Sequence, residues 1–208
     1  WNVLYNEALT ARMPRNCKIF AFEDDLALMV AAEEEQELVQ KANEALAIVK
    51  HNMSQYRLEL AHQKTEAVIL KSKRDRTKVV FNLDGVVVVP AKNVKYLGIW
   101  IDSKMTYGEH IKKTVEKVNK VTAALSGVLP NIGGPGYWKR KLLYNAVQSI
   151  LLFGAPVWYK VIRFQKYRTM QESAQRKLLI RVARAYKTVS TKAVQVIAGI
   201  PPIELMVE

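Results

Sequence analysis

Several residue types are scarce in this sequence of 208 residues, and each scarcity excludes a class of protein. The single cysteine, Cys17, excludes an intrachain disulfide and favours a reducing compartment. The three histidines, His51, His62 and His110, lack the spacing of a zinc site. No apolar run approaches the roughly 20 residues that a bilayer-spanning helix needs, and no signal peptide is evident. We therefore expect a globular, intracellular protein with no membrane partner.

Acidic residues are scarce in the second part of the chain, and the net charge of +13 is unevenly placed. Residues 1–70 contain seven Lys and Arg against eleven Asp and Glu, whereas residues 71–208 contain twenty-five against eight. Residues 139–187 contain twelve basic residues and one acid, Glu172. Such segregation is typical of a protein that binds a polyanion such as nucleic acid, although a merely basic soluble surface is the simpler alternative.

The hydrophobic periodicity predicts an α+β fold that divides near residue 105. Residues 1–105 show mostly strand patterns with one helix, and residues 106–208 show mostly basic helices. The predicted strands and hairpins cover 17–31, 58–60, 66–70, 79–89 (turning at Asp84-Gly85) and 94–101, and the predicted helices cover 32–55, 108–128, 137–153 and 164–186. The sequence opens within an amphipathic pattern, Trp1 to Leu9, so we expect a fragment of a longer chain.

Three consecutive carboxylates, Glu23, Asp24 and Asp25, separate two apolar segments of the first predicted hairpin. Adjacent carboxylates repel each other, and a divalent cation that binds them would neutralise this repulsion. In two-metal phosphoryl transfer, carboxylates hold paired Mg²⁺ ions that stabilise the attacking and leaving oxygens. The alternative is ordinary turn chemistry, because Asp is a common turn residue.

Together with its neighbours, this tip resembles a known family. Phe22-Glu23-Asp24-Asp25 after a strand looks like the Y/F-x-D-D box of reverse transcriptases. Its context is similar to that of insect non-LTR (LINE-type) retrotransposons of the jockey and ribosomal-DNA-inserting clades. Further matches follow in the family's order over essentially the whole chain: Trp1-Asn2, Lys64-Thr65-Glu66, Tyr96-Leu97-Gly98 with Asp102 and His110, Phe153 to Trp158, and Ala198 to Pro202.

The resemblance implies an RNA-directed DNA polymerase with a partial palm, an antiparallel sheet with helices, over residues 1–105, followed by a helical, basic thumb or connection region over 106–208. It implies that Asp24 and Asp25 are catalytic and bind Mg²⁺, with Mn²⁺ as an alternative. Lys64 would be a catalytic lysine near the phosphates of the incoming nucleotide, or else a solvent-facing loop residue. The residues implied to contact the primer or other nucleic acid are Tyr96, Leu97, Gly98, Lys139, Arg140, Arg176, Lys177, Arg181 and Arg184.

The implied partners are an RNA template, a DNA primer or target, deoxynucleoside triphosphates and the N-terminal fingers and palm portion of the same polypeptide, which supplies another metal-binding aspartate. The implied location during integration is the nucleus. The leading hypothesis is a polymerase fragment that is inactive alone, and there are two alternatives to it. One is a non-catalytic nucleic-acid-binding remnant, because Glu23 occupies a position that relatives usually fill with Ala, Val or Met. The other is a basic scaffold unrelated to polymerases.

Overall fold

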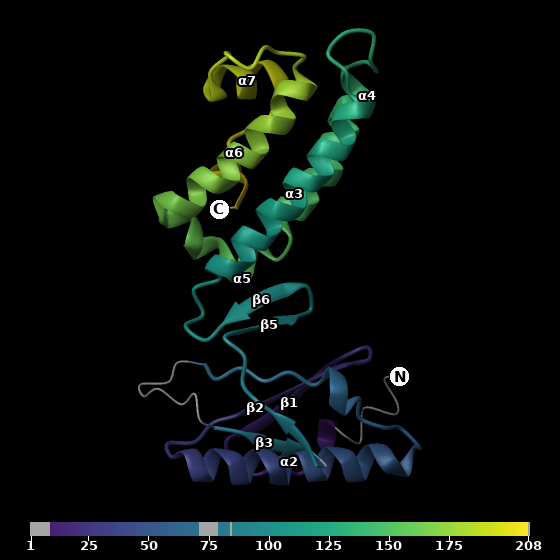
Figure 1. Ribbon diagram of the computed structural model, residues 1–208, viewed down its shortest axis with the longest axis vertical. Helices are drawn as coiled ribbons and strands as arrows, with labels where there is room; N and C mark the ends of the chain where they lie inside the picture. Colours follow the sequence, from purple (N-terminus) through teal and green to yellow (C-terminus); the bar gives the residue numbers. More distant parts are fainter. Residues whose placement is uncertain (1–8, 71–78, 84, 208) are drawn as a thin grey trace. The chain divides into compact units, whose positions relative to one another are not determined.

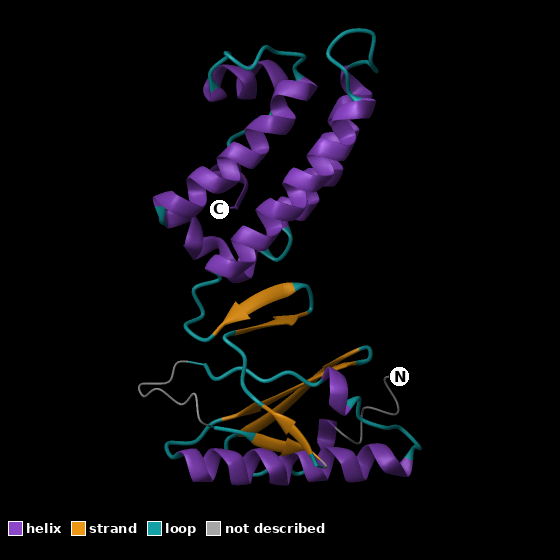
Figure 2. Ribbon diagram, viewed as in Figure 1, coloured by secondary structure: helices purple, strands orange, loops and turns teal. Residues whose placement is uncertain are grey.

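A computed structural model describes residues 9–70, 79–83 and 85–207 (Figures 1 and 2). Contacts between residues divide the chain into two compact units, Trp1–Gly98 and Ile99–Glu208. The first unit contains short antiparallel strand pairs and one long helix, and the second is mainly helical, so the predicted α+β class is confirmed. Within the described residues, no helix is both long and apolar enough to cross a bilayer.

The first unit begins with the predicted hairpin, which is confirmed as strands β1 (Cys17–Phe22) and β2 (Asp25–Val30). The two strands pair antiparallel with Cys17 opposite Val30 and Phe22 opposite Asp25. Side chains of a strand alternate between its two faces. The face with Ile19 and Ala21 packs against Val49 and Met53. Those two residues belong to helix α2 (Glu35–Gln55), whose buried residues recur at helical spacing.

Two short strands that we expected after α2 do not form. Residues 58–60 lie outside any strand, the 3₁₀ turn η1 occupies His62–Lys64, and Val68 makes one isolated parallel bridge with Ala91. A strand is stabilised by a run of hydrogen bonds to a neighbouring strand. Here the neighbouring segment pairs at a single position only, Val68 with Ala91, so no strand forms. The predicted hairpin at Asp84-Gly85 is present as β3 (Phe81–Leu83) and β4 (Val86–Val88).

The strand predicted for residues 94–101 is interrupted. The structure has β5 (Asn93–Tyr96), a tight turn at Leu97 and Gly98, and β6 (Ile99–Asp102). Both turn residues have positive φ, 45° for Leu97 and 84° for Gly98. Glycine adopts this conformation readily, so Leu97-Gly98 is better suited to a turn than to a strand. The basic segment 71–78, Asp84 and the predicted opening helix up to residue 8 lie outside the described residues.

The second unit is built on three long helices that pack on one another (Figure 1). They are α3 (Gly108–Val128), α4 (Tyr137–Leu152) and α6 (Gln165–Val182), close to the predicted ranges. Shorter elements that we did not predict complete it: α5 (Ala155–Trp158), η2 (Tyr159–Arg163), α7 (Thr191–Ala198) and α8 (Ile203–Val207). Their lengths fall below the window over which a periodic pattern is informative.

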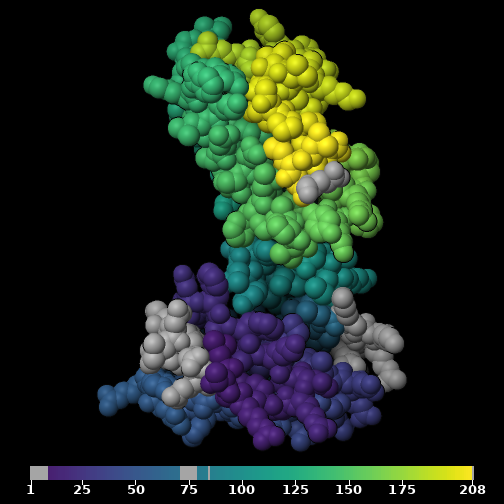
Figure 3. Space-filling model, turned by 180° about the vertical axis from the view of Figure 1, so that it is seen from behind, coloured from purple at the N-terminus to yellow at the C-terminus, as the bar shows by residue number. Residues whose placement is uncertain are grey.

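The core of the second unit combines apolar packing with a buried amide network. Trp158 has no exposed area, and its indole Nε1 donates to the Phe153 carbonyl at 2.8 Å. Gln175 of α6 donates to the Tyr144 hydroxyl of α4 at 3.0 Å and to the Pro201 carbonyl at 2.9 Å. Figure 3 shows the C-terminal segments, in yellow, lying against the green residues of α6. Because buried polar groups must find partners, this network fixes how the C-terminal segment docks.

The carboxylate of Asp102 organises the start of α3. It accepts hydrogen bonds from the main-chain N–H groups of Lys104, Thr106 and Tyr107 and from the Thr106 hydroxyl, at 2.6–3.1 Å. Partial burial raises the pKa of this carboxyl, but the hydrogen bonds lower it more, so the pKa lies below its ordinary value. The ionised form is therefore the one that stabilises the turn.

Replacing Gly154 should destabilise the second unit. Gly154 has φ of +67°, and a Cβ there would lie 2.6 Å from Cδ1 of Ile99. The left-handed backbone and the overlap together should lower the free energy of unfolding by about 2 kcal/mol in Gly154→Ala. Urea unfolding measures this. Gly136→Ala is the matched control, because its Cβ would meet nothing within 4 Å. Equal stability of the two variants would contradict the strain at Gly154.

The stabilising effect of Asp102 should depend on pH. A carboxyl whose pKa is lowered by folding stabilises the folded state above its unfolded pKa, about 3.9, and this contribution is lost as pH falls through the folded pKa. Asp102→Ala should therefore cost about 1 kcal/mol at neutral pH and progressively less below about pH 4. Thermal unfolding from pH 3 to 7 measures the difference. A difference that stays constant over this range would show that the charge of Asp102 is not involved.

Candidate active site

The three carboxylates lie where the first hairpin reverses direction. Because Phe22 pairs with Asp25, Glu23 and Asp24 form a two-residue turn, and Glu23 takes a positive φ of 53°. Asp25 is the first residue of β2, and its side chain shares a strand face with Phe22. All four of these side chains are exposed, with Phe22 at 57%. The short turn therefore presents Asp24 and Asp25 to solvent together.

Asp24 and Asp25 suit a hard divalent cation in their chemistry. Their oxygens are the ligand type that Mg²⁺ prefers, and Mg²⁺ is commonly held by one or two carboxylates plus substrate phosphates and waters. Within the described residues, no group of three or more His, Cys, Asp and Glu side chains is placed to hold a metal. The turn can thus supply two ligands of a site, and the remaining ligands must come from elsewhere.

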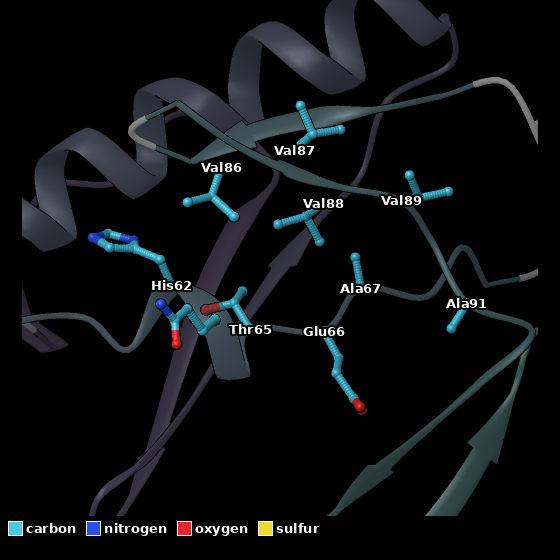
Figure 4. A pocket seen from close by; sticks show the side chains of 10 residues that line it. His62, Thr65, Glu66, Ala67, Val86, Val87, Val88, Val89 and Ala91 are labelled. Atoms are coloured by element: carbon cyan, nitrogen blue, oxygen red, sulfur yellow. The ribbon is translucent and has the colours of Figure 1, made fainter.

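The structure places Lys64 on an element separate from the carboxylate turn. It ends the 3₁₀ turn η1, where its main-chain N–H donates to the Ala61 carbonyl at 2.9 Å and its side chain is exposed. Its neighbours His62, Gln63, Thr65 and Glu66 border a pocket of about 210 Å³. Figure 4 shows this pocket between the 62–67 segment and the valines of β4. Lys64 is accessible for a charged substrate group, but it is not itself part of the pocket wall.

The segment Tyr96-Leu97-Gly98, predicted to contact a primer, forms the β5–β6 turn rather than a strand. Tyr96 is half-buried, whereas Leu97 and Gly98 are exposed, Leu97 at 38%. Leu97 is therefore a surface residue. An exposed leucine at the tip of a turn is available to contact a ligand.

Some of the basic side chains of α6 that were predicted to contact nucleic acid form hydrogen bonds within the protein. Arg176 donates to the Lys187 carbonyl at 2.8 Å, and Lys177 donates to the Asn119 side chain at 2.9 Å. Arg184, past the end of α6, donates to the carbonyls of Gly134 and Pro135. Arg181 is half-buried. These bonds to neutral acceptors leave the positive charges uncompensated, so the side chains keep their attraction for phosphate.

Arg140 differs from its neighbours because it is fully buried. Its guanidinium donates to the main-chain carbonyls of Leu129, Pro130, Pro135 and Arg181. Burial, and then the charges of Arg184 and Arg181, lower the pKa of this group. The prediction that Arg140 contacts nucleic acid does not fit this geometry, since no part of the side chain reaches solvent. We assign it to the structure of the loop 129–136 instead.

A group that the sequence analysis did not single out lies next to Arg140, at the start of α4. Tyr137 and Trp138 meet nearly edge to face, with ring centroids 5.2 Å apart. The Lys141 ammonium lies 5.6 Å from the Tyr137 ring centroid and 5.9 Å from that of Trp138. The spacing of two aromatics and a lysine after Gly-Gly-Pro-Gly was visible in the sequence. Their exposure was not, because an aromatic residue at a helix start is usually assigned to the core.

Comparison with known proteins finds a family match in the first part of the chain. Residues 1–101, which include the carboxylate turn, match the family described as "Reverse transcriptase (RNA-dependent DNA polymerase)". The resemblance of this part of the chain to reverse transcriptases is thus confirmed. No solved structure gives a significant match.

Two relatives that match nearly the whole chain come from insect retrotransposons of one type. The chain is 30% identical over 206 residues to the 115 kDa protein of type-1 retrotransposable element R1DM from Drosophila melanogaster, and 27% identical over 214 residues to a retrovirus-related Pol polyprotein of element R1 from Nasonia vitripennis. Both alignments cover 99% of the chain but only 20% and 63% of the relatives. The resemblance to insect non-LTR retrotransposon proteins is confirmed, and the chain is similar to a fragment of an R1-type reverse transcriptase.

Lys139 and Arg140 are adjacent in sequence but should have separable effects. Arg140→Met removes the hydrogen bonds that the guanidinium donates to four main-chain carbonyls, so the free energy of unfolding should fall by about 2–4 kcal/mol. Lys139→Ala removes an exposed charge, so stability should change by less than about 0.5 kcal/mol.

Urea unfolding and binding to a labelled RNA–DNA hybrid distinguish the two residues. Lys139→Ala should weaken hybrid binding and reduce the slope of log affinity against log salt by about 1. If Arg140→Met is as stable as the unchanged chain but binds the hybrid more weakly, then Arg140 contacts phosphate after all.

Proposed function

We propose that this chain is the part of an RNA-directed DNA polymerase that carries the catalytic carboxylates and the thumb region. The reaction is nucleotidyl transfer from deoxynucleoside triphosphates to a DNA primer on an RNA template. The observation that carries the proposal is the exposed Asp24-Asp25 pair, held at a two-residue turn within the residues that match the reverse transcriptase family.

We assign each candidate residue a role in this reaction. Asp24 and Asp25 would hold Mg²⁺, or Mn²⁺ in its place, with their carboxylate oxygens. When bound there, the cation supplies positive charge to the phosphate oxygens between which the nucleotide is transferred. Phe22, exposed on the same face as Asp25, offers an apolar surface to the primer terminus. Lys64 would supply a positive charge to the departing pyrophosphate.

The basic second unit supports binding of the template and primer. Lys139, Lys177 and Arg184 are exposed, and residues 139–187 contain one acid among twelve basic residues. Phosphate contacts of this kind position a nucleic acid without reading its sequence. Arg176 and Arg181, which are half-buried, would contribute through their charge.

A chimera tests the proposal, because the chain covers only a fifth of the Drosophila relative. This chain replaces the aligned segment of that relative, and primer extension is followed on an RNA template with Mg²⁺. Asp24→Asn and Asp25→Asn should each lower the rate by about 10²–10³-fold, since each removes charge from the reacting centre. Chelation of divalent cations should abolish extension.

Two controls separate chemistry from folding. Glu116→Gln, an exposed carboxylate on α3, should leave the extension rate within twofold of the chimera. Both aspartate variants should bind an RNA–DNA hybrid at least as tightly as the chimera, because they remove negative charge. Extension that survives Asp24→Asn and Asp25→Asn would disprove the assignment of the carboxylates.

A second candidate, a nucleic-acid-binding protein without catalysis, is favoured by Glu23. This residue holds a left-handed backbone that a glutamate rarely adopts, and it adds a third carboxylate to the turn. In the chimera, absence of extension that is restored by Glu23→Ala would support this candidate. Full activity with Glu23 in place would exclude it.

A further inference from the structure

The start of α4 carries an aromatic and basic cluster that the proposed function does not use. We name Tyr137, Trp138 and Lys141 the aromatic platform. Trp138 is 77% exposed and Tyr137 is 37% exposed. Two further apolar side chains in the neighbouring sequence, Ile132 and Leu142, are also exposed, at 92% and 69%. Trp138 and Leu142 are four residues apart on α4 and so lie on one face of the helix. Exposed apolar residues that gather on one face often mark an interaction site.

The geometry of the platform leaves a ring surface open. The Tyr137 and Trp138 rings are inclined at 70°, so they do not stack on each other. The Lys141 ammonium lies within 6 Å of both centroids, where a cation is attracted by the π-electrons. Since most of the Trp138 side chain still faces solvent, the indole can accept a flat partner beside a fixed positive charge.

Hydrogen bonds to main-chain carbonyls connect the start of α4 to neighbouring segments. The Tyr137 hydroxyl donates to the Ala198 carbonyl at the end of α7, at 3.1 Å. Arg140, within the same first turns of α4, ties the helix to the carbonyls of the preceding loop. Arg184 donates to the carbonyls of Gly134 and Pro135 in that loop. These bonds restrain Tyr137 and the main chain that carries Trp138, which lowers the conformational entropy lost when a ligand binds.

The charge around the platform selects an anionic partner. The sequence has no Asp or Glu from residue 117 to residue 171, a range that includes all of α4. Lys139 is exposed beside Trp138, and α7, which Tyr137 contacts, carries Lys192 and no acid. A ligand with flat aromatic groups and a repeating negative charge complements this surface, and a nucleic acid has both.

We propose that the aromatic platform binds unpaired RNA by stacking a base on Trp138, with Lys139 and Lys141 near the adjacent phosphates. Bases within a duplex hide their faces from protein, whereas unpaired bases expose them to aromatic side chains. The choice of RNA rests on the proposed function, in which the template is RNA and enters the reaction unpaired.

Binding of labelled oligonucleotides to the 208-residue chain tests the platform. The probes are a 12-nucleotide unpaired RNA, the same sequence as unpaired DNA, and an RNA–DNA hybrid. Trp138→Ala should weaken binding of unpaired RNA by about tenfold, as expected for the loss of one stacked base, and Trp138→Phe should keep most of the affinity. Hybrid binding should change by less than twofold.

Two readouts distinguish stacking from a structural effect. The slope of log affinity against log salt should be unchanged in Trp138→Ala, because no charge is lost, and reduced in Lys139→Ala. Phe164→Ala is the matched control, since Phe164 is an exposed aromatic (65%) of the same unit outside the platform. It should bind unpaired RNA like the unchanged chain.

The outcomes separate this inference from the proposed function. Unchanged RNA affinity in Trp138→Ala, with hybrid binding intact, overturns the platform and leaves the polymerase proposal standing. Equal losses for unpaired DNA and RNA overturn the assignment to RNA. A dimer in sedimentation that Trp138→Ala converts to a monomer, with RNA binding unaffected, shows that the patch joins two copies of the chain. Binding to none of the probes counts against the proposed function itself.

Discussion

The helical unit depends on the buried guanidinium of Arg140. Its donors satisfy carbonyls on both sides of the α3–α4 loop and one near the end of α6, so a single side chain joins three segments that would otherwise diverge. A buried cation without a carboxylate is costly, and here main-chain dipoles compensate it. This interaction restrains a loop rich in glycine and proline and, with it, the start of α4, which carries Tyr137 and Trp138.

In the first unit, the two faces of the β1–β2 hairpin have different surroundings, because side chains of a β-strand alternate between its faces. One face of the β1–β2 hairpin packs on α2 through Ile19 and Ala21. The opposite face carries Phe20, Phe22 and Met29, exposed at 46%, 57% and 52%. The carboxylates lie at the turn between the strands, so their position is set by the register of the hairpin. A shift of one residue would exchange the two faces and bury the wrong set.

The sequence was most informative where local patterns and tertiary packing agree. The alternation around Asp24-Asp25 and the helical spacing of Ile111, Val115 and Val118 both predicted the observed elements. Leu97-Gly98 was placed in a strand because apolar residues flank it, although the glycine suits a turn. Predictions failed where a partner far along the chain decides the structure. Arg140 was grouped with its basic neighbours, because the sequence does not show that main-chain carbonyls surround its guanidinium. The sequence analysis made no prediction for Trp138, which is exposed. The ligands that would complete a metal site with Asp24 and Asp25 are not predictable from this chain.

The rarity of acids in the helical unit has a consequence for control of binding. Its only histidine, His110, is buried, and desolvation lowers its pKa, so it is neutral near pH 7. This unit therefore has no histidine that gains or loses a proton near neutral pH. In the proposed function, counterions would compete with the nucleic acid for this positively charged surface. The ionic strength should therefore affect binding more strongly than a small change of pH near neutrality.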